Sequence, residues 1–247
     1  MRSPTCVVCR SIVILALAAT FQSVSSKGSA GERESSWETG QRNRESLLRY
    51  LRPVLKAAGG GGRLYYRVQC WSKDAGDDFS YPQLELEAPS PERTGLDAVR
   101  EIFKKSSEVT VTQDRNGMIG IRIGDVSNQL LETKINVLKL KELERYNPQE
   151  AMMAIERTSE VRAKMRQLGI VDPPTILHEH LLKPAPGLPH LPASFEKIAF
   201  DEALDQVART FNCLVVYGEC TRADSTHLIS VEFVDIAGIE AFFKRNK

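Results

Sequence analysis

The chain has 247 residues, of which 26% are charged and 42% are hydrophobic, and its formal net charge is +1. This composition is that of a globular protein and excludes disorder along the whole chain. The charge is close to zero and no long run of lysine or arginine occurs. Binding to nucleic acid, which needs a concentrated positive surface, is therefore not expected.

The N-terminal segment has the pattern of a secretory signal peptide. An apolar run over residues 11–21, SIVILALAATF, follows two arginines and is short for a membrane span, and small residues come after it. Cleavage after Ser26 or after Ala30 would satisfy the small-residue rule, and an uncleaved anchor is the alternative. We expect residues 1–26 to be a signal peptide and the protein to be periplasmic or secreted. Contact with a membrane would come only through an uncleaved signal anchor, if at all.

Removal of the signal peptide leaves three cysteines in a compartment where disulfides persist. Cys213 and Cys220 are the nearest pair and are our candidates for a disulfide, provided that the chain turns back near Gly218 to bring their Cα atoms within about 7 Å. Cys70 lies in an alternating strand pattern, which favours a buried free cysteine. The mature chain has neither a CxxC motif nor a zinc-ligand pattern, so no cofactor is predicted.

The mature chain begins with polar sequence and then a helix pattern. Residues 27–43 are rich in serine, glycine and glutamate, and we expect a flexible leader there. Apolar residues recur on one face over 44–58 and predict a helix, which Pro53 interrupts. The glycine run at 59–62 lacks the lysine of a phosphate-binding loop and is interpreted as a turn. A first α+β domain is predicted over residues 44–170.

Within this domain, strand and helix patterns alternate. We expect strands over 64–71, 83–88, 109–112, 118–123 and 135–140, and helices over 94–103, 128–133 and 147–169. Asn116-Gly117 predicts a tight hairpin turn between two of these strands. Asn147-Pro148 and Gly169 are the start and stop signals of the longest predicted helix.

A proline-rich segment follows the first domain and predicts a linker over residues 171–193. Its prolines prevent a continuous helix or a central strand, so it is expected to be extended and semi-rigid. His178 and His180 could face one metal ion, but their spacing fixes no third ligand, and a surface pair is the preferred interpretation. His190 lies in the same segment.

The residues after the linker repeat an earlier pattern at a constant offset of 105 positions. Ala203-Leu204 and the strand at 214–216 match Ala98-Val99 and the strand at 109–111. Each copy follows the order strand, helix, strand, strand, and the second copy occupies residues 194–247. The predicted fold class is therefore α+β, with two small units of mixed sheet and helices on one face.

The second copy resembles the short N-terminal domains of secretins and TonB-dependent receptors. In these domains a strand leads into an "x-x-A-L-x-x-(V/L)-A" helix and then a "(L/V)-x-V-x-Y" strand. The matching positions here are Phe200, Ala203, Leu204, Val207, Ala208, Leu214, Val216 and Tyr217. They cover residues 195–243 and, more faintly, 83–140. The resemblance implies a periplasmic module that binds signalling or assembly partners through a sheet edge or a helix face.

The sequence offers little support for catalysis. It has no G-x-S-x-G motif and no cysteine in a known nucleophile context. The candidate acid pairs are Asp77 with Asp78, Glu219 with Asp224, and Asp201 with Asp205, which we interpret as solvated turn residues and a helix cap. We expect a non-enzymatic interaction module with an envelope or secreted protein partner. A small-ligand-binding protein and an enzyme of unrecognised type are the alternatives.

Overall fold

The computed structural model describes residues 36–59, 61–70, 81–171 and 187–236. These residues belong to one compact unit, Glu34–Lys247. The predicted signal peptide, most of the predicted leader, Asp77, Asp78, His178 and His180 lie outside the described residues.

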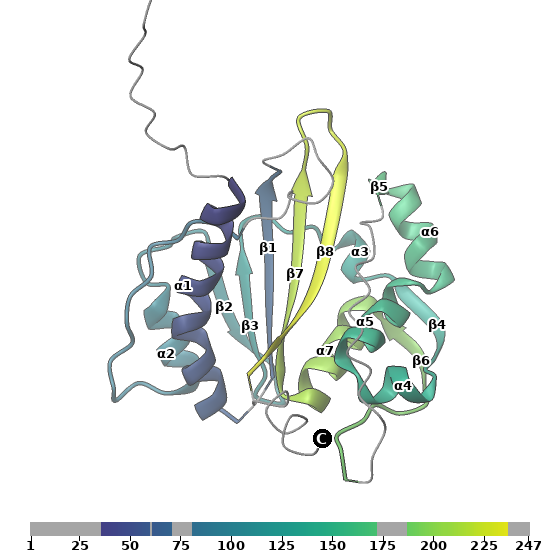
Figure 1. The fold of residues 1–247 in the computed structure, drawn as a ribbon, viewed down its shortest axis with the longest axis horizontal. Coiled ribbons are helices and arrows are strands. Elements are labelled where there is room, and N and C mark those ends of the chain that lie inside the picture. Colours follow the sequence, from purple (N-terminus) through teal and green to yellow (C-terminus); the bar gives the residue numbers. More distant parts are fainter. Residues whose placement is uncertain (1–35, 60, 71–80, 172–186, 237–247) are drawn as a thin grey trace, which may run out of the picture. The chain divides into compact units, whose positions relative to one another are not determined.

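A six-stranded mixed sheet forms the centre of the fold (Figure 1). Its strands, in spatial order, are β2 (Val109–Gln113), β3 (Ile119–Ile123), β1 (Gly62–Gln69), β7 (Cys213–Thr221), β8 (His227–Asp235) and β5 (Ile170–Val171). β1 is parallel to both of its neighbours, β3 and β7. The pairs β2–β3 and β7–β8 are antiparallel hairpins.

Helices cover both faces of this sheet (Figure 1). α1 (Ser36–Ala57) and α2 (Gly95–Ile102) pack together on one face. The opposite face carries α3 (Asn128–Leu131), α4 (Glu142–Tyr146), α5 (Pro148–Glu156), α6 (Ser159–Gln167) and α7 (Phe200–Phe211). A second, two-stranded antiparallel sheet of β4 (Lys134–Lys139) and β6 (Ser194–Ala199) lies on the same side.

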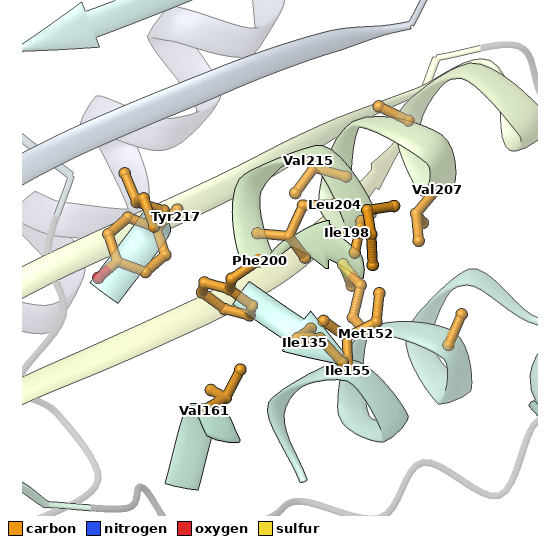
Figure 2. Packing of buried hydrophobic residues seen from close by; sticks show 14 of the residues in the cluster. Ile135, Met152, Ile155, Val161, Ile198, Phe200, Leu204, Val207, Val215 and Tyr217 are labelled. Atoms are coloured by element: carbon orange, nitrogen blue, oxygen red, sulfur yellow. The ribbon is translucent and has the colours of Figure 1, made fainter. Parts of the chain in front are cut away.

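The central strands are apolar on both faces because each face has its own core. In β1, Leu64 and Tyr66 belong to the core under α1 and α2, whereas Tyr65 belongs to the core under α7. This alternation follows from the two-residue period of a strand. Figure 2 shows the α7 core, in which Phe200 and Leu204 of the helix lie between Tyr217 of β7 and Met152 of α5. Tyr217 is fully buried.

The α+β class predicted from the sequence is confirmed, and so are the helix at 94–103 and the two hairpins. The residues of the two predicted domains, however, share one sheet, because β1 of the first pairs along its whole length with β7 of the second. The two repeated strand-helix-strand-strand units also differ in how their strands pair with the rest of the fold. β1 lies beside the second strand of the β2–β3 hairpin and beside the first strand of β7–β8. β6 pairs with β4 and not with its own unit.

Three local predictions were wrong. α1 begins at Ser36, inside the predicted leader, and continues through Pro53, whose ring lies on the exposed face. Residues 83–88 form no strand. Their alternation reflects an extended segment that packs Leu84 and Leu86 against the α1–α2 core. The helix predicted over 147–169 is divided into α5 and α6, because the Thr158 hydroxyl bonds to the Ile155 carbonyl and Thr158 turns extended.

Candidate functional site

The outer edge of β2 is the feature of the sheet best suited to bind another chain. Hydrogen bonds from the Asp114 amide to the Met118 carbonyl and from the Gly124 amide to the Glu108 carbonyl fix the hairpin register. In an antiparallel pair the bonded residues alternate, so Val111 and Gln113 turn their amides away from β3. Within the described residues, β3 is the only strand that pairs with β2. The Val109 amide donates to the Ser106 carbonyl. We call the remaining outward backbone groups, from the Val109 carbonyl to Gln113, the β2 edge.

The side chains of β2 do nothing to block this edge. The strand reads VTVTQ and carries neither a charge nor a proline. Val109 and Val111 pack against the α1–α2 core, and Thr110 and Thr112 are exposed on the other face. Sheet edges are usually protected by lysines, prolines, bulges or extreme shortness, because an open edge can pair with another chain. β2 has none of these features.

The other strand edges of the described chain differ from the β2 edge. β5, at the far side of the sheet, has two residues and pairs only with His227 and Leu228, so the rest of the outer edge of β8 has no strand partner within the described residues, but β8 carries the acids Glu232 and Asp235. In the small sheet, the Asn136 amide of β4 donates to the Glu160 carboxylate, and the Ala199 amide of β6 donates to Glu202. β6 is also bent at Lys197, whose φ of 51° lies in the left-handed region. Among the strand edges of the described residues, the β2 edge is therefore distinguished by its lack of charged side chains and not by being the only unpaired edge.

The turn of the β2–β3 hairpin is held by Asp114. Its Oδ1 accepts hydrogen bonds from the amides of Asn116 and Met118, both at 2.9 Å. Gly117 has a φ of 84°, a conformation that glycine adopts without steric cost, so the predicted Asn116-Gly117 turn is confirmed. These hydrogen bonds and the neighbouring Arg209 guanidinium lower the pKa of the Asp114 carboxyl, although its partial burial acts in the opposite direction.

A chain of ion pairs ties this turn to α7 and β1. Arg209 of α7 contacts Asp114 at 2.5 Å and Asp205 at 3.8 Å, and Arg63 of β1 contacts Asp205 at 2.9 Å. Burial raises the pKa of Asp205 to about 6, against the opposing effect of the two guanidinium groups. The hairpin is thus anchored to the helix behind it, so the β2 edge is a rigid feature of the surface.

Beside this chain of ion pairs, β1 contributes a buried tyrosine. Tyr65 of β1 lies under two guanidinium groups, with Arg63 at 5.8 Å and Arg122 at 5.9 Å from its ring centre. Burial raises its pKa well above the usual value for tyrosine, so the hydroxyl stays neutral. A neutral phenol between cations is suited to packing and not to proton transfer near pH 7.

Two of the hollows on the described surface are candidate ligand sites, and both are open to solvent. One, of about 520 Å³, lies between β6 and α7 and is lined by Phe195, Glu196, Lys197, Ile198, Glu202, Asp205, Gln206 and Arg209. The other, of about 240 Å³, lies where α3 meets the start of β8. Its polar lining includes Arg67, Glu219 and His227. Binding pockets for small molecules are usually deeper and largely apolar.

The structure pairs the cysteines differently from our expectation. Cys220 forms a disulfide with Cys70, at a Cα–Cα distance of 5.2 Å, and Cys213 is a buried free thiol. The predicted Cys213–Cys220 bridge was wrong because β7 runs straight from one cysteine to the other, and seven residues of strand extend by about 23 Å. Gly218 does not turn the chain. It continues β7 beside Tyr66.

The described members of the predicted acid pairs have separate hydrogen-bond partners. Glu219 accepts hydrogen bonds from the Tyr217 hydroxyl and the Ser127 amide, whereas Asp224 accepts one from the Thr226 amide in the β7–β8 turn. Asp201 accepts a bond from the Glu202 amide at the start of α7. Asp205 belongs to the ion-pair chain described above.

His190 stacks on Tyr146, with ring centres 5.0 Å apart, and a ring nitrogen lies 3.1 Å from the Leu188 carbonyl. The described residues contain no group of three side chains suited to a metal ion. Every helix in the described part of the chain is too short or too polar to cross a membrane.

The sequence predicts β2 as a strand but not its position at the edge of the sheet. The signal available was its composition, since an uncharged alternation of valine and threonine beside an Asn-Gly turn is typical of an exposed hairpin strand. The ion-pair chain could not be found in this way, because its four residues lie in three separate parts of the chain.

No family model, no curated protein and no solved structure matches this chain.

Proposed function

We propose that this protein is an exported, non-enzymatic interaction module that binds an extended segment of an envelope or secreted protein as an added strand at β2. The observation that carries the proposal is the open, uncharged β2 edge on a hairpin anchored from behind. In strand addition, backbone hydrogen bonds supply affinity and alternate side chains supply specificity. Here the partner's side chains would lie beside Val109 and Val111 on one face and beside Thr110 and Thr112 on the other.

Two further features support this proposal. The Cys70–Cys220 disulfide suits an oxidising compartment, as the N-terminal apolar segment also does. The resemblance of residues 195–243 to the short N-terminal domains of secretins and TonB-dependent receptors implies partner binding through a sheet edge or helix face. The alternative, a small ligand in the hollow between α3 and β8, has the mixed lining of Arg67, Glu219 and His227 in its favour.

The test begins with proteins captured from the envelope fraction by the purified chain. Each captured protein is then tested against Thr110→Lys/Thr112→Lys, which adds two charges to the exposed side chains of the edge without removing a backbone donor. The control variant Asn136→Lys/Ser194→Lys adds the same charge to exposed positions of the small sheet. A partner that binds at the β2 edge is expected to lose at least tenfold in affinity with the first variant and little with the second.

Hydrogen exchange gives an independent readout of the binding mode. The amides of Val111 and Gln113 face outward and should exchange rapidly in the free protein, then become protected in the complex. The amides of Thr110 and Thr112 pair with β3 and should be protected in both states. Capture of a protein whose binding leaves Val111 and Gln113 unprotected would refute the proposal, and so would a co-purifying small molecule with no protein partner.

A further inference from the structure

The β2 edge is complementary to a second copy of itself. Val111 and Gln113 turn both their amides and their carbonyls outward, whereas Thr112 between them pairs with Gly120 of β3. When two such edges run antiparallel with Thr112 opposite Thr112, Val111 of each copy lies opposite Gln113 of the other. Each outward amide then meets a carbonyl of the second copy, so the edge is satisfied by its own sequence.

The two ends of the β2 edge carry opposite charges. Glu108 lies just before the strand and Arg115 follows it, both are exposed, and within the described residues neither side chain has an ion-pair partner. Asp114, at the same end as Arg115, is already paired with Arg209. Antiparallel pairing brings the Arg115 end of each copy to the Glu108 end of the other. The charges are therefore complementary across a two-fold axis.

The same residues favour pairing about Thr112 over the neighbouring registers. A shift that places Val111 opposite Val111 also brings Glu108 opposite Asp114 of the other copy, and like charges directly opposite each other are destabilising. The remaining registers place Val111 or Gln113 opposite a residue that lies outside β2. In the register about Thr112, Glu108 instead lies opposite the uncharged Asn116.

We infer that, in the absence of a partner, the β2 edges of two copies of this chain pair antiparallel about Thr112 and form a symmetric dimer. The interface is isologous, because the same surface is used by both copies. The second copy occupies the backbone groups that an added strand needs, so the dimer competes with partner binding. This regulatory role rests on the proposed function, whereas the self-pairing stands without it.

The length of the edge limits the strength of the pairing. β2 has five residues, and the contact between two such strands is far smaller than the area of about 1,200–2,000 Å² that stable complexes bury. We therefore expect a dissociation constant of about 100 μM to 1 mM. Dilute protein is then monomeric, with the Val111 and Gln113 amides open to exchange. A partner that adds side-chain contacts displaces the second copy.

The experiment is sedimentation equilibrium of the purified chain from about 10 μM to about 500 μM, across which the unmodified protein should pass from monomer toward dimer. Thr112→Lys and Thr112→Glu, each alone, place two like charges opposite each other and should weaken self-association at least about fivefold. An equimolar mixture of the two variants places opposite charges together. It should dimerise at least as strongly as the unmodified protein.

Two further pairs of variants provide the controls. Ser194→Lys and Ser194→Glu add the same charges to an exposed position of β6 and should leave self-association unchanged, alone or mixed. The register is tested by Thr112→Cys, which mild oxidation should crosslink between copies because the two positions are directly opposite. Thr110→Cys should not crosslink, since its two copies would lie about 14 Å apart.

Several results would overturn the inference. One is an unmodified chain that stays monomeric at the highest concentration. The others are a dimer that persists in both Thr112 variants, a mixture that fails to restore it, an equal effect of the Ser194 variants, and equal crosslinking of the two cysteine variants.

These measurements use the pure chain and are independent of the capture test of the proposed function. A dimer that captures no envelope protein would support the inference and refute the proposed function. Capture at the β2 edge by a chain that stays monomeric would do the reverse. Where both are found, addition of the captured protein should dissociate the dimer.

Discussion

The Cys70–Cys220 disulfide allows the sharpest prediction for stability. It joins the end of β1 to the end of β7 and closes a loop of 150 residues. In the chain-entropy description, the stabilisation rises with the logarithm of loop length, and a loop of this size corresponds to about 5 kcal/mol. Domains of this kind have a total stability of about 5–15 kcal/mol, so loss of the bridge removes a large share of it.

The perturbation is the double variant Cys70→Ala/Cys220→Ala, measured by urea unfolding beside the unmodified protein and Cys213→Ala. We expect the double variant to lose about 3–5 kcal/mol and to show no further change on addition of a reductant. The unmodified protein and Cys213→Ala should both be destabilised by the reductant, because both contain the bridge. Equal unfolding midpoints for the double variant and the unmodified protein would refute the reasoning, and so would a Cys213–Cys220 peptide in a non-reducing digest.

Three further perturbations test the burial of Glu156 on α5, the anchoring of the β2–β3 hairpin and the packing of α7. Burial raises the pKa of Glu156 to about 7 from an ordinary 4.5, so its contribution to stability is present below pH 4.5 and is lost as the pH rises through 7. At pH 8, Glu156→Gln should therefore unfold at a higher urea concentration than the unmodified protein, with a free energy of unfolding greater by no more than about 3 kcal/mol. At pH 4 the two proteins should have equal free energies of unfolding. Arg209→Ala should cost about 1–3 kcal/mol and speed hydrogen exchange of the Asn116 and Met118 amides, since it removes the charged hydrogen-bond partner of a half-buried Asp114. Unchanged exchange would contradict the anchoring of the hairpin. Gly61→Ala should lower the free energy of unfolding by more than about 3 kcal/mol, because the added Cβ would overlap the Ala208 carbonyl of α7. The control Gly59→Ala places its Cβ in open space and should lose only the strain energy of its positive φ. Thermal or urea unfolding measures both.

Local features of the fold were predictable from the sequence. The Asn116-Gly117 turn between two alternating segments identified the β2–β3 hairpin, and the apolar spacing of α7 identified the helix that covers β1 and β7. Such signals arise from residues close together in the chain, where backbone conformation and one-sided burial leave a periodic pattern. They predict which elements exist and not which of them become neighbours.

The pairing of β1 with β7 shows why the neighbours of each strand could not be predicted from the sequence. A glycine in a strand pattern can mark a turn or a close approach, and Gly218 was interpreted as the former. In the structure a Cβ at Gly218 would lie 2.7 Å from the Tyr66 ring, so the glycine makes room for a tyrosine that is distant in sequence. The same long-range pairing brings Cys220 to Cys70, and neither partner carries a local signal for the other.

The place of β1 between β3 and β7 has a consequence for the order in which the chain can fold. β1 is complete by Gln69, but one of its neighbours begins only at Cys213. A chain that is still being made or translocated therefore holds Leu64, Tyr65 and Tyr66 without one of the two neighbouring strands of β1 until its last part arrives. Long-range pairing of this kind is slow, and incomplete chains expose apolar strands. The protein is thus expected to need protection from aggregation until β7 has been delivered, and to acquire its sheet and its disulfide together.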